Sequence, residues 1–212
     1  MESISFKRRI FEIVAVLVTG LGKILFVNVF NQKFAFTLVA CLFWIGYITL
    51  RFSRNPELLE YWGFTKKNFG KSFRKLLPYA LICVLLFLLY GIYFDTIILK
   101  WHALVILLIY PIWGVIQQYL VVGLVAGNLA DQKQVQISRM WIIIGTSVLF
   151  SIVHYPSLML IIGTFFLALV YVVEYLKERN LWVLGIYHGW LGCFYYYLVL
   201  NRDPFVEMFG WI

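Results

Sequence analysis

The sequence predicts an all-α fold, a polytopic bundle of about seven transmembrane helices. Hydrophobic residues make up 63% of the 212-residue chain and charged residues only 13%, whereas soluble domains carry about 25% charged residues. So many apolar side chains cannot be buried inside a soluble particle of this length. They also form long apolar stretches, which is the pattern of membrane-spanning helices. We therefore predict a single membrane domain over residues 1–212.

Seven apolar stretches are near the length of about 20 residues that a helix needs to cross a bilayer. They are residues 10–30, 34–52, 76–95, 101–129, 139–155, 157–176 and 181–200. The first stretch contains Lys23, and the fourth contains Pro111 and Gly114. Because proline removes a backbone donor and bends helices, we expect a kink or a break near Tyr110 and Pro111.

Basic residues lie mainly at the ends of these stretches and predict the orientation of the chain. The net charge of +8 could suit a nucleic-acid partner, but the basic side chains are not arranged along a soluble face. If the N-terminus is cytoplasmic, most of the 18 lysines and arginines lie on the cytoplasmic side, as the positive-inside rule requires. We therefore expect a multi-pass protein of a prokaryotic plasma membrane, with its C-terminus outside. Membrane lipid is an expected partner and nucleic acid is not.

Residues 55–75, between the second and third stretches, combine basic and aromatic side chains. This composition predicts an amphipathic interfacial segment, a helix or turn on the cytoplasmic membrane face. Its aromatic side would face the lipid and its lysines the anionic headgroups. A solvated loop is the alternative.

Polar side chains inside three of the apolar stretches mark the candidate catalytic site. They are Gln117 and Gln118 in the fourth stretch, His154 in the fifth and His188 in the seventh. A polar or ionisable group at hydrocarbon depth is costly and usually faces the protein interior or a wet cavity. We expect these groups to converge on one hollow within the bilayer.

Phe150 and Ser151 are expected to line the same hollow as His154. They precede the histidine by four and three residues, so all three lie close to one helical face. The structural alternative is that His154 only hydrogen-bonds a carbonyl group near the end of its helix.

His188 lies among three glycines, Gly185, Gly189 and Gly192. Small residues at this spacing let another helix approach closely, so the histidine could be a packing group at a helix crossing. The presence of a second histidine in an apolar stretch favours a site, and Gly192 is expected to line its cavity.

The two histidine segments resemble a known family. Phe150-x-x-x-His154, followed by Asn180-Leu181-Trp182 and then His188, is similar to the second and third motifs of the CPBP (Abi) family. This family comprises CAAX-type prenyl endopeptidases and bacteriocin-processing intramembrane proteases. The resemblance implies a membrane peptidase that acts on a membrane-bound or lipidated peptide.

The resemblance covers about residues 60–200, which we take as a CPBP-like core. At its start, Trp62-Gly63-Phe64 and Asn68 resemble the interfacial segment that precedes the family's core. The two histidine helices are its most specific part.

The chain departs from the family at the first motif. The family has two adjacent glutamates followed by an arginine, where this chain has Gln117, Gln118 and Val122. The family also has Asn or Asp where this chain has Gly192. In the mechanism that the resemblance implies, a glutamate is the general base that activates water, and a glutamine amide has no comparable basicity. Because an unpaired buried cation would be costly, loss of the arginine together with both glutamates is a coordinated change.

Other groups could supply the missing base. His154 or His188 could serve, because a neutral imidazole is a base near physiological pH. Glu174 lies three residues from Lys177 and is interpreted as a charge at headgroup level. A Ser151 nucleophile is disfavoured by its poor geometry relative to His154.

Two histidines and two amides are a weak ligand set for zinc, so we expect no metal and no cofactor.

Three functions from different classes remain open. The first is an intramembrane peptidase that retains hydrolysis through a histidine base. The second is a catalytically silent relative that binds membrane-tethered peptides as an immunity factor, a chaperone or a subunit of a hetero-complex. The third is a small transporter or lipid-handling protein, which ranks last because only one broken span is predicted where paired broken spans are typical.

Overall fold

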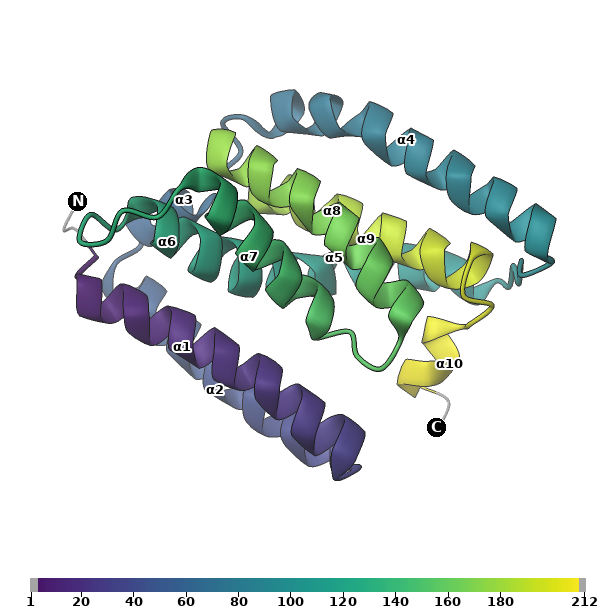
Figure 1. The fold of residues 1–212 in the computed structure, drawn as a ribbon, viewed down its shortest axis with the longest axis horizontal. Helices are drawn as coiled ribbons and strands as arrows, with labels where there is room; N and C mark the ends of the chain where they lie inside the picture. Colours follow the sequence, from purple (N-terminus) through teal and green to yellow (C-terminus); the bar gives the residue numbers. More distant parts are fainter. Residues whose placement is uncertain (1–3, 210–212) are drawn as a thin grey trace. The chain divides into compact units, whose positions relative to one another are not determined.

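The computed structural model describes residues 4–209, and its regular secondary structure is helical throughout these residues (Figure 1). The elements are α1 (Phe6–Gly22), η1 (Lys23–Val29), α2 (Lys33–Arg54), α3 (Glu57–Trp62), α4 (Phe69–Phe94), α5 (His102–Gln118), η2 (Tyr119–Gly127), α6 (Asn128–Asp131), α7 (Arg139–Ile152), α8 (Leu158–Lys177), α9 (Leu181–Leu198) and α10 (Pro204–Phe209). The two η elements are π-helical, with hydrogen bonds from residue i to i+5. The predicted all-α class is confirmed.

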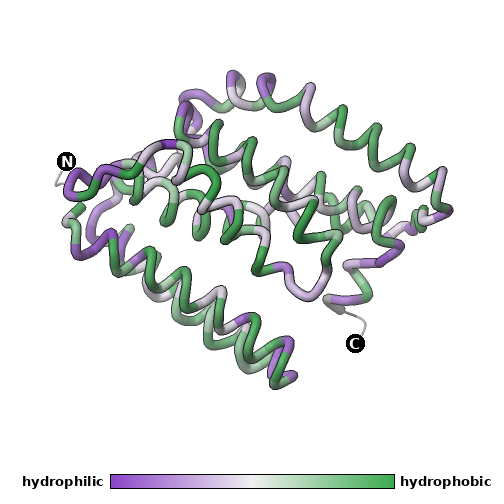
Figure 2. The backbone as a smooth tube through the Cα atoms, viewed as in Figure 1, coloured by the Kyte–Doolittle hydropathy of each residue, from purple (hydrophilic) through white to green (hydrophobic). Residues whose placement is uncertain are grey.

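Within residues 4–209, five helical stretches are long and apolar enough to cross a membrane. They are Phe6–Val29, Lys33–Arg54, Phe69–Phe94, His102–Asp131 and Leu158–Lys177. These stretches match the first four predicted spans and the sixth. Figure 2 shows hydrophobic residues along the helices and hydrophilic residues mainly at their ends. The other two predicted spans are also helices, but α7 has only 14 residues and α9 is not among the five, so the number seven is not confirmed.

The chain divides into two compact units, each formed by two separate stretches. Within the described residues, the first unit holds 4–65 and 119–179, and the second holds 66–118 and 180–209. In the first unit, η2 packs against α1, α7 and α8, and α7 packs against α8. In the second unit, α9 packs against both α4 and α5, and α10 packs against α5.

The fourth predicted span does not break near Tyr110 and Pro111. α5 continues through Pro111 as one helix as far as Gln118, and the irregularity comes later, at Tyr119, where η2 begins. The expectation of a break there is therefore wrong, and the alternative of a kink at Pro111 stays a prediction. In apolar surroundings a helix tolerates an internal proline where neighbouring helices and local changes in helix type satisfy the freed backbone groups.

The predicted interfacial segment is largely helical, because residues 55–75 contain α3 and the first turns of α4. Gly63 ends α3 with a φ of 97°, and a Cβ atom there would lie 2.9 Å from the backbone carbonyl carbon of Arg179. Trp62 is buried, with its ring centroid 6.1 Å from that of Tyr119, and its carbonyl accepts a hydrogen bond of 2.9 Å from Tyr175. This aromatic side chain therefore faces protein, which corrects the expectation that it faces lipid.

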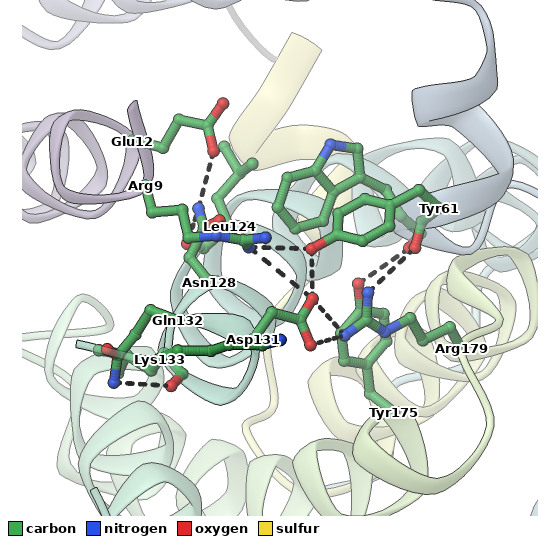
Figure 3. Close-up of polar contacts among 12 residues, drawn as sticks. Arg9, Glu12, Tyr61, Leu124, Asn128, Asp131, Gln132, Lys133, Tyr175 and Arg179 are labelled. Atoms are coloured by element: carbon green, nitrogen blue, oxygen red, sulfur yellow. Dashed lines mark hydrogen bonds and ion pairs between the residues drawn. The ribbon is translucent and has the colours of Figure 1, made fainter. Parts of the chain in front are cut away.

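A buried polar network joins the helix ends of the first unit (Figure 3). Arg9 donates hydrogen bonds to the Tyr61 hydroxyl at 2.9 Å and to the Asn128 side-chain oxygen at 3.0 Å. Asn128 donates in turn to Glu12 at 2.7 Å, and Tyr47 donates to the other Glu12 oxygen at 2.6 Å. Arg9, Glu12 and Asn128 are all buried. None of these contacts was predicted from the sequence.

Asp131 and Arg179 extend the same network. One guanidinium nitrogen of Arg179 lies 2.6 and 2.7 Å from the two Asp131 carboxylate oxygens, and Tyr61 donates its hydroxyl hydrogen to this carboxylate. Burial raises the pKa of Tyr61, and the hydrogen bond to Asp131 raises it further. Burial opposes the charge on Arg179, but Tyr175 and Asp131 outweigh it and raise its pKa. The phenol therefore stays neutral and the guanidinium stays charged.

In the second unit, the Asp203 carboxylate links the start of α10 to α5 and α9 through hydrogen bonds. His102 Nδ1 lies 2.9 Å from one Asp203 carboxylate oxygen, and the Tyr197 hydroxyl donates to the other at 2.7 Å. The backbone N–H of Phe205 also donates to Asp203 at 3.0 Å. Burial opposes ionisation of this carboxyl, but these hydrogen bonds outweigh burial and lower its pKa below the ordinary value.

The lowered pKa of Asp203 predicts a pH-dependent stability. A carboxyl with a depressed folded-state pKa contributes stability above its unfolded-state pKa, about 3.9, and this contribution is lost as the pH falls through the folded-state value. We expect Asp203→Asn to lower the free energy of unfolding by about 1.5–3 kcal/mol at neutral pH. The difference between the two proteins should shrink in acid. Thermal unfolding in detergent over a series of pH values measures it, and a difference that stays constant with pH contradicts this role.

Candidate functional site

The sequence-predicted site residues are divided between the two units. Gln117, Gln118, His188 and Gly192 belong to the second unit, and Phe150, Ser151 and His154 belong to the first. Different local contacts position the side chains of each group.

In the second unit, α5 and α9 cross at closest approach where both carry glycine. A Cβ atom on Gly185 would lie 2.2 Å from a methyl carbon and 2.5 Å from the Cα of Val115. A Cβ atom on Gly114 would lie 2.3 Å from the Gly185 carbonyl oxygen, and one on Gly189 would lie 2.3 Å from the backbone nitrogen of Pro111. Only glycine permits this crossing, as small residues permit close helix packing in membranes.

The start of α9 is fixed by a side-chain cap. Asn180 accepts a hydrogen bond of 3.1 Å from the backbone N–H of Val183, which satisfies one of the unpaired donors at a helix start. Its amide nitrogen donates to the Asn68 side-chain oxygen at 2.7 Å. Asn180 therefore sets where α9 begins, and with it the position of His188 two helical turns further on.

The crossing brings His188 and Gln118 together. Gln118 Nε2 lies 3.1 Å from His188 Nδ1, and both side chains are buried. With the amide in this orientation, Gln118 donates to Nδ1, so the neutral imidazole carries its hydrogen on Nε2. The Gln118 carbonyl oxygen is buried and has no hydrogen-bond partner within the described part of the chain. Such a group is costly unless a ligand or water hydrogen-bonds it.

The other two predicted residues of the second unit do not join this pair. Gln117 is half-buried. Gly192 does not take part in the tight crossing, because a Cβ atom there would make an ordinary contact of 3.6 Å with the Tyr110 ring. A Cβ atom therefore has room at the position where the resembled family has Asn or Asp.

In the first unit, His154 lies in the turn that follows α7. Its Nδ1 lies 2.9 Å from the carbonyl oxygen of Phe150 and 3.4 Å from the Thr164 hydroxyl. A carbonyl oxygen can only accept, so Nδ1 carries the hydrogen, and Nε2 of the neutral ring holds a lone pair. The expected hydrogen bond to a nearby carbonyl is present, and it also fixes the tautomer in which Nε2 is a base.

The other candidates of the first unit have local roles. The Ser151 hydroxyl donates to the Val148 carbonyl oxygen at 2.9 Å, a common arrangement for a helical serine. Lys177 Nζ lies 3.8 Å from a Glu174 carboxylate oxygen, as the sequence spacing predicts. Among residues 4–209, no three His, Cys, Asp or Glu side chains are grouped so that they could hold a metal ion.

Two further polar residues near His154 were not singled out by the sequence analysis as site residues. Lys23 and Asn28 both donate hydrogen bonds to the carbonyl oxygen of Tyr155, at 2.8 and 2.7 Å. The signal that could have identified them is a lysine and an asparagine inside an apolar span.

Comparison with known families supports the resemblance drawn from the histidine segments. Residues 98–194 match the family model described as type II CAAX prenyl endopeptidase Rce1-like. This match covers slightly less than half of the chain and includes Gln118, His154 and His188. No curated protein and no solved structure matches the chain. The resemblance to CAAX-type endopeptidases is thus confirmed over residues 98–194, and with the five apolar helices it indicates a multi-pass membrane protein of peptidase-like type.

Proposed function

We propose that this chain is an intramembrane peptidase-like protein that binds a membrane-tethered or lipidated peptide through Gln118 and His188. The observation that carries this proposal is the buried carbonyl oxygen of Gln118 beside His188, which has no hydrogen-bond partner among residues 4–209 and lies within the segment that matches the Rce1-like family. We place the protein in the cytoplasmic membrane with its N-terminus inside, from the distribution of basic residues.

The pair has the hydrogen-bonding groups that a peptide unit requires. Gln118 offers an acceptor and His188 a donor at Nε2, and a peptide unit offers one N–H and one carbonyl group. If the Gln118 amide were rotated by 180°, the pair would offer a donor on Gln118 and an acceptor on His188. In both orientations the pair contains one donor and one acceptor, so the complementarity does not depend on this assignment.

The absence of carboxylates at positions 117 and 118 argues for binding over the chemistry of the resembled family. A glutamine amide can orient a peptide or a water molecule but cannot take its proton. Peptide capture without cleavage would suit an immunity factor, a chaperone or a subunit of a hetero-complex.

Hydrolysis through a histidine base is the second candidate function. It is supported by the His154 tautomer, because the hydrogen bond from Nδ1 to the Phe150 carbonyl leaves the basic lone pair on Nε2. In this function His154 Nε2 would take a proton from water as the water attacks the scissile carbonyl, and would pass that proton to the leaving amine as the C–N bond breaks.

A photo-crosslinkable prenylated peptide in proteoliposomes tests these functions. Gln118→Leu removes the acceptor beside His188, and we expect it to reduce crosslinking about tenfold, the effect of losing one hydrogen bond of roughly 1.4 kcal/mol. The neighbouring Gln117→Leu is the matched control and should crosslink as the unmodified protein does. Equal crosslinking by both variants contradicts the proposal.

The same assay separates binding from hydrolysis. Gln118→Glu places a carboxylate next to the His188 imidazole and should release a detectable C-terminal fragment if only the base is missing. Cleavage by the unmodified protein that His154→Ala abolishes, with crosslinking retained, would instead establish the histidine-base reaction.

A further inference from the structure

The first span makes a set of contacts with the turn that carries His154. Lys23 Nζ and Asn28 Nδ2 donate to the same acceptor, the Tyr155 carbonyl oxygen, at 2.8 and 2.7 Å. One helical turn earlier, Gly20 lies so close that a Cβ atom on it would be 3.0 Å from a methyl carbon of Val153. The span therefore contacts residues on both sides of His154.

The π-helical geometry of η1 explains how two residues five apart reach one oxygen. In an α-helix, residues five apart are rotated by about 140° and lie on different faces. η1 begins at Lys23 and includes Asn28, and its i to i+5 hydrogen bonds bring such residues nearer to one face. π-helical turns are frequent at functional sites, and here the turn aims two donors at one peptide group.

Without a hydrogen-bond partner, the charged side chain of Lys23 would be energetically costly within an apolar span. A lysine within an apolar span usually pairs with another charge or with backbone carbonyls, and such residues mark functional sites. The Tyr155 carbonyl belongs to the peptide group between Tyr155 and Pro156, one residue beyond His154. An ammonium donor makes a stronger hydrogen bond than a neutral donor, so Lys23 restrains the backbone next to the imidazole.

We propose that Lys23 and Asn28 are positioning residues for His154. By holding the Tyr155 carbonyl, they keep the turn in the conformation in which Nδ1 of His154 reaches the Phe150 carbonyl, and so they keep the lone pair on Nε2. The first span lies outside residues 98–194, so it supplies a part of the site that the family match does not include. The proposal rests on the proposed function only where it assigns His154 a role towards a peptide.

Nitrogen NMR of histidine-labelled protein in lipid nanodiscs tests this inference. The ring-nitrogen shifts report which nitrogen carries the hydrogen, and the His154→Gln variant assigns the signals. At mildly alkaline pH, we expect the unmodified protein to show His154 only as the Nδ1–H tautomer. The double variant Lys23→Met with Asn28→Leu should lose this single-tautomer signature and show both forms.

Three controls make the result decisive. Lys33→Met removes an exposed lysine at the start of α2 and should leave the His154 signals unchanged. Lys23→Arg keeps a cationic donor and should retain the Nδ1–H tautomer. The His188 signals report folding, because its contact with Gln118 lies in the other unit.

Unchanged His154 signals in the folded double variant would overturn the proposal. If the double variant does not fold, the single variant Asn28→Leu is measured instead. It retains the Lys23 charge and removes one of the two donors to the Tyr155 carbonyl. It should give a partial change, and no change would overturn the proposal. Peptide capture is measured separately, so its loss or absence bears on the proposed function and leaves this inference standing.

Discussion

Replacing Gly189 with alanine is expected to destabilise the second unit by about 1–3 kcal/mol, the range for overpacking a tightly packed core. A Cβ atom at this position would lie 2.3 Å from the backbone nitrogen of Pro111 and 2.5 Å from the carbonyl carbon of Tyr110. Backbone atoms cannot rotate away as a flexible side chain can. α9 must therefore move away from α5, and His188, the preceding residue, must move with it.

Gly192→Ala is the matched control for Gly189→Ala, because it adds the same methyl group three residues further along α9. The nearest atoms to its Cβ would be those of the Tyr110 ring, at 3.6 Å. We expect this variant to melt within about 0.5 kcal/mol of the unmodified protein. Thermal unfolding in detergent compares the two, and peptide crosslinking reports on Gln118 and His188. Equal stability of the two variants would show that the crossing is not tightly packed.

The sequence predicted part of this crossing. Gly185 and Gly189 were identified as small residues that permit close approach, and both do so. Gly192 has the same spacing pattern but makes only an ordinary contact. The sequence alone does not distinguish these cases, because the distance between two helices depends on the rotation of both about their axes.

The helical class and five of the spans followed from composition and stretch length alone, because a bilayer sets the length of a spanning helix. The contact between Gln118 and His188 links residues 70 apart in the chain. It was expected only on the general ground that polar groups in apolar spans find one another. Whether Gln117 or Gln118 would make it was not predictable, since neighbouring residues on a helix point about 100° apart.

The role of Lys23 was not predictable from helical periodicity. An α-helical pattern of 3.6 residues per turn separates Lys23 from Asn28, and only the π-helical turn between them brings both to one carbonyl. The polar network of the first unit was missed for a different reason. Its hydrogen-bond partners are 35 to 119 residues apart, and each of its charged residues looks in the sequence like an ordinary headgroup-level charge.

Glu12→Ala is expected to have the largest effect on stability, a loss of about 3–5 kcal/mol, because removing one partner of a buried pair leaves uncompensated polar groups. Glu12 is 1% exposed. Its two oxygens accept from Tyr47 and Asn128, and one of them lies 3.4 Å from Nε of Arg51. Its loss would therefore remove polar contacts of α1 with both α2 and α6 and leave the Asn128 amide nitrogen with one acceptor, the Leu124 carbonyl oxygen, instead of two.

Glu207→Ala is the control, because Glu207 also pairs with an arginine but at the surface. The contact with Arg202 joins side chains that are 37% and 42% exposed, and exposed ion pairs contribute about 0–1 kcal/mol. Glu12→Gln should fall between the two, since its amide oxygen can accept one of the two hydrogen bonds but its nitrogen cannot accept the other. Thermal unfolding in detergent ranks the three variants. A Glu12→Ala protein as stable as Glu207→Ala would mean that the network of Figure 3 does not hold the helix ends of the first unit together.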